Sequence, residues 1–315
     1  MILSRTSRNS ADPLSAVLTA LGAEATRPTR LEASGDWALA FPAFDRLTFV
    51  AIVKGNCWLE TPNHPSRRMT KGDVVLIGST DYVVSSSSGV AAQDGVQLYK
   101  SEGDRVRLGG QDSVLLGGAV AFSAGSADFL LNMLPTILIV DGQAEAATAI
   151  STILNLLDRE SREPQIGREA VMKRLAELMV VEGIRFQIEA SHVEEHGWLA
   201  AFADPRIARA LHRFHADIAH TWTVGKLAAE AGMSRSSFAA KFLQLVGLSP
   251  LGYVRLWRLT LARTRLAAGV PVAEIATKVG YSSQSAFGHA YRLMFGVSPG
   301  RVRRARSGHP RLRTY

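Results

Sequence analysis

The spacing of hydrophobic residues changes along the 315-residue chain from the period of strands to the period of helices. Residues 31–122 contain short apolar runs separated by turn residues, a pattern typical of strands in an antiparallel barrel or sandwich. Turn sequences such as Lys-Gly-Asn at 54–56 and Lys-Gly-Asp at 71–73 join these runs, and the last run can close the sheet. The predicted strands are residues 47–53, 57–60, 74–77, 96–99 and 114–122.

From residue 129 onward the apolar residues follow a helical period. Residues 144–158 form one candidate helix, and residues 166–187 form a longer one that Pro164 bounds. Such helices can either pair with a second copy of the chain or pack on the barrel, and the sequence leaves both open. Asp204 is a good N-cap and Pro205 a good first helical residue, so a new domain is predicted to begin there.

The segment 223–299 contains one pattern of apolar residues, glycine and serine twice. In each copy, apolar residues at i, i+3, i+4 and i+7 line one face of a short helix that ends near a glycine. A second helix with its own apolar stripe follows and leads into a Gly-x-Ser-Pro sequence. These second stripes are Phe238, Phe242 and Leu245 in one copy and Phe287, Tyr291 and Met294 in the other. This order predicts two helix-turn-helix motifs, each of which would place its second helix in the major groove of DNA. The opening stripes are Val224, Leu227, Ala228 and Ala231, and Val272, Ile275, Ala276 and Val279.

Seven helices are predicted in this C-terminal domain, and the long fourth one separates the two motifs. Its roughly 18 residues would span about 27 Å at 1.5 Å per residue. That length is close to the roughly 34 Å of one turn of DNA, so both second helices could enter successive major grooves on one face. The predicted helices are residues 205–220, 224–231, 235–246, 250–268, one opened by Pro271, residues 284–295, and one opened by Pro299.

Composition indicates a globular chain, because 47% of its residues are hydrophobic and 20% are charged. No apolar run is long enough to span a bilayer, and the first eight residues lack the apolar core of a secretory signal. We therefore expect a cytoplasmic location without membrane contact. The single cysteine, Cys57, excludes an internal disulfide and is predicted to be simply buried.

The net charge of +8 conceals an asymmetry between the two parts of the chain. Residues 205–315 hold 18 Lys and Arg against three acids, a balance of +15. Because the whole chain has 36 basic and 28 acidic residues, residues 1–204 hold 18 basic and 25 acidic ones, a balance of −7. The C-terminal part is thus predicted to bind a polyanion, and the acidic part to have another role.

Taken together, the C-terminal residues resemble the DNA-binding domain of the AraC/XylS family of bacterial regulators. The strand-rich part, through residues 37–42 and 71–77, resembles more loosely the cupin-like sensor domain that precedes such a domain. The resemblance implies binding to double-stranded DNA, a small-molecule effector in the barrel, a homodimer formed by the helices after it, and contact with RNA polymerase. The residues that carry the first resemblance are those at 222–224, 227–235, Phe238, Phe242, 247–250, 275–276, 279–281, Phe287 and 295–299.

The expected DNA contacts lie opposite the buried stripes of the two second helices. Gln284 can pair with adenine, and Arg235 with guanine or a phosphate. The small residues permit only close approach, so phosphate and shape contacts should supply much of the affinity. The predicted contacts are Arg235, Ser236, Ala239, Ala240, Lys241, Gln284, Ser285, Gly288, His289 and Arg292. Further phosphate partners are expected as a group among Arg255, Arg258, Arg301, Arg303, Arg304 and Arg306.

The barrel offers aromatic candidates for an effector pocket but no metal ligands. Trp37, Phe41, Phe49 and Trp58 are predicted to point inward, where they either line a cavity or fill the core. His64 is the only histidine before residue 192, so the histidine set of a cupin metal site is missing and no cofactor is expected. The pairs His192 with His196 and His212 with His215 have a spacing that could hold zinc, but further ligands are lacking nearby.

The sequence therefore predicts an α+β chain, with an N-terminal antiparallel cupin-like β-barrel and appended helices, followed by an all-α domain. We interpret it as a DNA-binding transcription factor and not an enzyme. Two alternatives remain, a cupin-type metalloenzyme fused to a DNA-binding domain and a ligand-independent DNA binder. The predicted domains are the sensor barrel at 1–130, the helical dimerisation segment at 131–200, the DNA-binding domain at 205–306 and a basic tail at 307–315.

Overall fold

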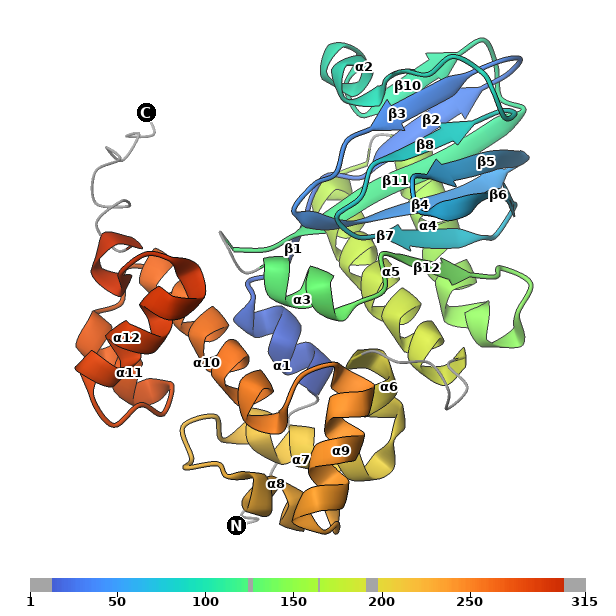
Figure 1. The fold of residues 1–315 in the computed structure, drawn as a ribbon. Helices are drawn as coiled ribbons and strands as arrows, with labels where there is room; N and C mark the ends of the chain where they lie inside the picture. Colours follow the sequence, from blue (N-terminus) through green and yellow to red (C-terminus); the bar gives the residue numbers. More distant parts are fainter. Residues whose placement is uncertain (1–12, 124–126, 164, 191–197, 303–315) are drawn as a thin grey trace, which may run out of the picture. The chain divides into compact units, whose positions relative to one another are not determined.

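The computed structural model describes residues 13–123, 127–163, 165–190 and 198–302 (Figure 1). The chain divides into two compact units, each assembled from segments that are distant in sequence. The strand-rich unit comprises residues 24–121 and 134–192, and the helical unit comprises residues 1–23, 122–133 and 193–315. Helices α1 (Pro13–Ala20) and α3 (Ala127–Met133) thus belong to the helical unit although they precede most of it in the sequence. Among the described residues, no helix is both long and apolar enough to cross a membrane.

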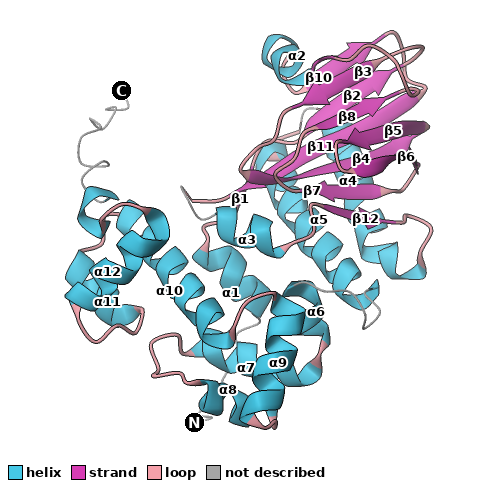
Figure 2. Cartoon of the chain, viewed as in Figure 1, coloured by secondary structure: helices cyan, strands magenta, loops and turns pink. Residues whose placement is uncertain are grey.

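Two sheets form the strand-rich unit (Figure 2). The larger sheet has the order β10 (Arg105–Leu108), β2 (Thr29–Ala33), β11 (Ser113–Ala121), β4 (Arg46–Lys54), β7 (Val74–Ile77) and β12 (Ile137–Val140), with β1 (Glu24–Ala25) paired to β11. The smaller sheet has the order β6 (His64–Thr70), β5 (Asn56–Thr61), β8 (Tyr82–Ser85), β3 (Ala38–Phe41) and β9 (Gln93–Asp94). Most pairings are antiparallel, as predicted, while the edge strands β10 and β9 pair in parallel with β2 and β3.

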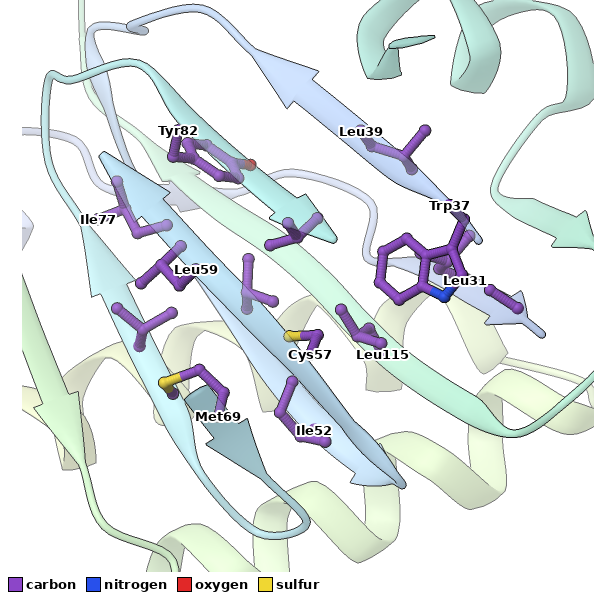
Figure 3. Packing of buried hydrophobic residues seen from close by; sticks show 14 of the residues in the cluster. Leu31, Trp37, Leu39, Ile52, Cys57, Leu59, Met69, Ile77, Tyr82 and Leu115 are labelled. Carbon is purple, nitrogen blue, oxygen red and sulfur yellow. The ribbon is translucent and has the colours of Figure 1, made fainter. Parts of the chain in front are cut away.

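The hydrophobic core of this unit lies between the two sheets (Figure 3). Because side chains alternate along a strand, Val50 and Ile52 of β4 point into this core, whereas Phe49 points to the opposite face of the larger sheet. Cys57 is fully buried in the core, and burial raises the pKa of its thiol to about 12. The predicted burial of this cysteine is confirmed, and its thiol stays protonated at neutral pH.

Two expectations for the strands were wrong. Residues 96–99 lie in helix α2 (Gly95–Glu102), because the Asp94 carboxylate caps this segment by accepting a hydrogen bond from the Gln97 backbone N–H at 3.0 Å. The last predicted strand, β11, lies in the middle of the larger sheet between β2 and β4 and so does not close it. The four residues at 96–99 are too few for the spacing of apolar residues to distinguish a strand from one turn of helix.

Helices α4 (Thr148–Arg162) and α5 (Arg168–Ala190) pack on the outer face of the larger sheet. Gly183 lets α5 approach β7 closely, since a Cβ at this position would lie 2.8 Å from the Leu76 side chain. The Gln187 side-chain amide donates to the Ile139 carbonyl oxygen at 2.6 Å, which joins α5 to β12. Packing on the sheet is therefore one role of these helices, and Val171 and Leu178 of α5 remain exposed.

A buried ionic network joins the sheet to α4. The Glu32 carboxylate is fully buried and accepts hydrogen bonds from Arg30 at 2.7 Å, Arg105 at 2.5 Å and Arg107 at 3.0 Å. Arg30 also donates to Asp158 of α4 at 2.7 Å. Burial by itself would raise the pKa of Glu32, but the three arginines outweigh it and lower the pKa to about 2. The carboxylate is therefore ionised at neutral pH in spite of its burial.

The predicted helices of the C-terminal part are confirmed with small changes at their ends. Three of them, α8 (Val224–Ala231), α9 (Arg235–Val246) and α12 (Gln284–Phe295), have the predicted bounds. A short helix, α6 (Trp198–Ala203), precedes them, and a last helix begins at 299 and is described as far as 302. The others are α7 (Pro205–Ala216), α10 (Pro250–Ala267) and α11 (Val272–Lys278).

Candidate nucleic-acid interface

The pairs α8–α9 and α11–α12 are two copies of one local structure within the helical unit. The hydroxyl of Ser234 caps α9 by accepting from the Ser237 backbone N–H at 3.2 Å. In the same way, Ser283 caps α12 by accepting from the Ala286 N–H at 3.1 Å. Both second helices end at a glycine in the left-handed region, Gly247 in the first copy and Gly296 in the second. The two copies in the sequence therefore share the residue types that begin and end their second helices.

Aromatic residues of the second helices form the core of each pair. Phe238 and Phe242 of α9 are buried with ring centroids 5.5 Å apart, and Phe287 and Tyr291 of α12 are buried with centroids 5.6 Å apart. The predicted stripes are thus confirmed for these four residues. Because these rings are buried in the core, they are unavailable as stacking platforms for bases.

The opposite face of α9 and α12 carries most of the residues predicted to contact DNA. Arg235, Ser236 and Ala240 are exposed on α9, where Ala239 is half-buried. On α12, Gly288 is half-buried, and a Cβ added to it would have no heavy atom within 4 Å. Neither helix contains an acidic residue. The exposed predicted contacts of α12 are Gln284, Ser285, His289 and Arg292.

Two cations of the predicted interface are instead engaged inside the helical unit. Lys241 of α9 forms an ion pair with Asp204, whose carboxylate also caps α7 through the backbone N–H groups of Arg206 and Ile207. Arg258 of α10 was expected to contact phosphate, but its guanidinium is half-buried and donates to backbone carbonyl oxygens. A guanidinium whose N–H groups are already bonded to backbone has few donors left for DNA.

The hydrogen bonds of Arg258 fix the turn of the second helix pair. It donates to the carbonyl oxygens of Ile218 at 2.8 Å, His220 at 2.7 Å and Gly280 at 3.2 Å. Gly280 has a φ of 82°, and a Cβ there would lie 2.7 Å from the Arg258 guanidinium. Both the backbone conformation and the close guanidinium therefore require glycine at this turn.

Arg209 has the equivalent role in the first helix pair. From α7 it donates to the carbonyl oxygens of Glu230 at 3.0 Å and Ala231 at 3.2 Å, beside the turn at Gly232. The spacing of residues in the sequence did not predict that either arginine would bond to the turn of its helix pair. A signal was present, since Arg209 precedes Gly232 by almost the same number of residues as Arg258 precedes Gly280. Each repeat therefore includes the helix before its helix pair.

Several predicted residues fall outside the described part of the chain. The tail arginines Arg303, Arg304 and Arg306 lie there, and so does the pair His192 and His196. Arg255 and Arg301 are described and exposed. These two therefore stay predicted phosphate partners.

A cavity of about 400 Å³ opens between the two sheets of the strand-rich unit, beside α2. Of the four aromatic residues predicted to line an effector pocket, Phe41 lines this cavity and Trp37 is part of the core instead. Phe49 lies on the outer face of the larger sheet, and Trp58 alternates with the core residues Cys57 and Leu59 and so points away from the core. The sequence could not assign these faces, because the alternation of side chains along a strand does not tell which face of the sheet another sheet will cover.

The described residues do not fit a metal site of the kind that cupin enzymes use. No group of three or more His, Cys, Asp or Glu side chains in the described ranges is arranged to hold a metal ion. His64 is exposed at the start of β6, and His215 is buried, with its Nε2 2.8 Å from the Tyr253 hydroxyl.

Comparisons with known proteins match two separate parts of the chain to known families. A cupin family model matches residues 12–189, and a helix-turn-helix domain model matches residues 227–305. Two relatives carry the name "Putative AraC-like transcription regulator". The one from Streptomyces antibioticus is 34% identical and covers 93% of this chain and 98% of its own. The one from Streptomyces lividans is 34% identical and covers 96% and 99%. The crystal structure of ToxT from Vibrio cholerae O395 is 12% identical with a TM-score of 0.35, over 91% of this chain and 99% of that one.

Proposed function

The chain belongs to the AraC family of helix-turn-helix transcription regulators, with an N-terminal cupin domain, and from this we propose that it grips two adjacent major grooves of DNA. In this proposal α9 and α12 are the reading helices, and the C-terminal domain at 205–306 with its basic tail at 307–315 is the DNA-binding part. The protein acts in the cytoplasm as a regulator and not as an enzyme. Its contact with RNA polymerase, or its occupancy of a promoter, sets the transcriptional output.

The observation that carries this proposal is the equivalence of the exposed faces of α9 and α12. Each presents polar residues at its N-terminal half, with Arg235 and Ser236 on one and Gln284 and Ser285 on the other. The N-terminal half of a recognition helix is the part that usually meets base edges. The spacer α10 has 18 residues, so it spans about 27 Å, which is comparable to one turn of DNA.

The two copies differ in what they can read. Ala239 and Ala240 offer only apolar contact or close approach, whereas Gln284 and His289 of α12 carry donors and acceptors. We therefore assign most of the base discrimination to α12 and mainly anchorage, through Arg235, to α9. Shape and phosphate contacts supply the rest of the affinity.

The test is selection of bound sequences from a random DNA library by the full chain, followed by footprinting of a selected site. We expect two protected boxes whose centres lie about one helical turn apart, roughly 10.5 base pairs. A single box would contradict the use of both helix pairs. Selected sequences without a shared motif would contradict sequence-specific regulation.

We also propose that the chain is a homodimer whose contact involves α5, in the helical segment at 131–200. Val171 and Leu178 lie seven residues apart on one face of this helix and are 42% and 47% exposed. Because the packing of α5 on the sheet leaves these side chains uncovered, a second copy related by twofold symmetry could bury them. Their exposure supports a dimer through this face.

The strand-rich unit, which contains most of the predicted sensor barrel at 1–130, is proposed to bind a small-molecule effector. Its cavity of about 400 Å³ supports this role, since small-molecule sites usually measure about 300–1,000 Å³. Binding would change DNA occupancy by repositioning the DNA-binding parts of the dimer. If no small molecule changed the affinity for DNA, the alternative of a ligand-independent binder would replace this part of the proposal.

A further inference from the structure

The cavity of the strand-rich unit is lined by apolar side chains and by cations. Its apolar walls come from both sheets and from α2, and they include Leu31, Leu39, Phe41, Val50, Val96 and Leu115. Three cationic side chains, Arg27, Arg46 and Lys100, also line it, and none of the described lining residues is acidic. The cavity thus combines an apolar wall with an excess of positive charge, although residues 1–204 as a whole are acidic.

The three cations differ in how far the protein itself neutralises them. Arg27 already forms an ion pair with Asp104 at 2.5 Å. For Arg46 and Lys100, no carboxylate of the described residues lies within ion-pair distance. These two side chains therefore supply charge that the described part of the protein leaves uncompensated.

Arg46 is the more constrained of these two cations. Its Nε is buried and has no hydrogen-bond partner among the described residues, and its guanidinium lies 4.0 Å from the centroid of the Phe44 ring. Burial lowers the pKa of Arg46, because the protein withholds part of the solvation that a charged guanidinium would have in water. A buried charged donor without a partner is costly, and an anion bound beside it would remove that cost.

Two tyrosines add neutral donors to the same cavity. Tyr82 stacks on Phe41 with ring centroids 4.9 Å apart, and Tyr99 lies on α2. Burial raises the pKa of the Tyr99 hydroxyl to about 12 and also raises the pKa of the Tyr82 hydroxyl. Both hydroxyls are therefore protonated at neutral pH. The Tyr99 hydroxyl is hydrogen-bonded to the Thr29 side chain, and the Tyr82 hydroxyl can donate a hydrogen bond to an acceptor in the cavity.

We infer that this cavity binds a small organic anion, an apolar body carrying one carboxylate or comparable acidic group that pairs with Arg46. The inference rests on the proposed effector-binding function and specifies the chemical class of the effector. At roughly 30 Å³ per water-sized group, a volume of about 400 Å³ accommodates on the order of a dozen non-hydrogen atoms. The apolar walls bind the body of the ligand, and the cations select its charge.

The test compares, by calorimetric titration, two ligands of about this size that share a naphthalene ring and differ in charge. These are 2-naphthoate, an anion, and 2-naphthamide, in which a neutral amide replaces the carboxylate. We expect the full chain to bind the anionic probe at least tenfold more tightly than the neutral one. Arg46→Gln should remove this preference, and Arg46→Lys should retain part of it because the charge remains. Arg68→Gln is the matched control, since Arg68 is exposed on β6 and does not line the cavity.

Equal affinity of the unsubstituted chain for both probes would overturn the inference, and so would an Arg46→Gln variant that keeps the full preference. If Arg46→Gln fails to fold, Lys100→Met replaces it, with a smaller loss of the preference expected and an unchanged preference counting against the inference. Binding of a selected DNA site is measured on the same preparations. Tight DNA binding without anion preference would contradict only the ligand class, whereas absent DNA binding would contradict the proposed function whatever the probes show.

Discussion

The ring of Phe129 packs against the ring of Trp257, with centroids 4.9 Å apart and planes inclined by 57°. Phe129 belongs to α3, which lies between β11 and β12 in the sequence, whereas Trp257 belongs to the spacer helix α10. Strand β11 supplies part of the cavity wall, including Leu115. Helix α3, which follows the cavity-lining strand β11 in the sequence, therefore packs against the spacer helix α10.

Replacing Phe129 should destabilise the helical unit. Its side chain is 3% exposed, so Phe129→Ala should lower the free energy of unfolding by about 3–5 kcal/mol, as cavity-forming substitutions of aromatic residues do. Urea unfolding followed by tryptophan fluorescence measures this change. Leu293→Ala is the control, because that side chain is 74% exposed and its loss should cost no more than about 0.5 kcal/mol. A loss below about 1 kcal/mol for Phe129→Ala would contradict its role in the core.

His215 should make the helical unit sensitive to mild acid. Burial, with a smaller effect of His212, lowers the pKa of His215 from 6.5 to about 3. The unfolded chain therefore binds the proton more tightly between these two values, and the folded state loses stability as the pH falls below about 6.5. From pH 7 to pH 5 the loss should be about 2 kcal/mol.

The non-titrating variant His215→Gln tests this dependence, since glutamine can still bond the Tyr253 hydroxyl. The free energy of unfolding, measured between pH 5 and pH 7, should change less in this variant than in the unsubstituted chain. His64→Gln is the control, because His64 is exposed. An equal pH slope for the His215→Gln variant and the unsubstituted chain would rule out His215 as the source.

Glu32→Gln should destabilise the strand-rich unit, because it removes the carboxylate that compensates Arg30, which is 5% exposed. Breaking one partner of a buried ion pair costs about 3–5 kcal/mol. The pKa of about 2 lies below the ordinary 4.5, so the stabilisation by Glu32 is complete above about pH 4.5 and is lost as the pH falls toward 2.

Chemical unfolding at pH 7 and at pH 3 measures both effects. The variant should be less stable at pH 7 and should lose less stability than the unsubstituted chain between the two pH values. Glu102→Gln, an exposed position on α2, should change neither quantity. Unchanged stability of Glu32→Gln at pH 7 would show that the arginines do not depend on this carboxylate.

Gln284 and Arg292 should affect DNA binding in different ways. Gln284→Ala should relax the preference at one base pair, at a cost of about 1–3 kcal/mol on the preferred sequence. Arg292→Ala should weaken binding to all sequences alike and reduce the slope of log K against log salt by about 1. Titrations of a selected site and its single-base variants, at several salt concentrations, separate the two. Equal losses on every sequence for both variants would disprove these roles.

Leu178→Lys should weaken the proposed dimer. Placing a charge on the exposed apolar face of α5 opposes its burial against a second copy, so light scattering should show a larger monomer fraction. Leu251→Lys is the matched control, since Leu251 is 43% exposed and belongs to α10 of the helical unit, not to α5. A dimer equally stable in both variants would place the dimer contact elsewhere, and a monomeric unsubstituted chain would contradict the dimer itself.

The C-terminal helices were predictable because each one is bounded by local chemistry. Ser234 and Ser283 cap α9 and α12, and Gly247 and Gly296 end them, so the bounds follow from residues adjacent in the sequence. The exposure of Arg235, Ser236, Gln284 and Ser285, which are predicted to contact DNA, also followed from the helical period. Residues 96–99 were assigned to the wrong element because their cap, Asp94, lies just outside the apolar run.

The sequence by itself determined the family, the two helix pairs, the spacer between them and the location of positive charge, since these depend on short-range spacing and composition. Only the tertiary structure decided that Lys241 pairs with Asp204, that Arg258 holds backbone carbonyl groups, and that Phe41 faces a cavity while Phe49 does not. The physical reason is that partners far apart in sequence decide these outcomes. The two-residue period of a strand and the 3.6-residue period of a helix tell which residues share a face. The element packed against that face determines whether those residues are buried, line a cavity or stay exposed.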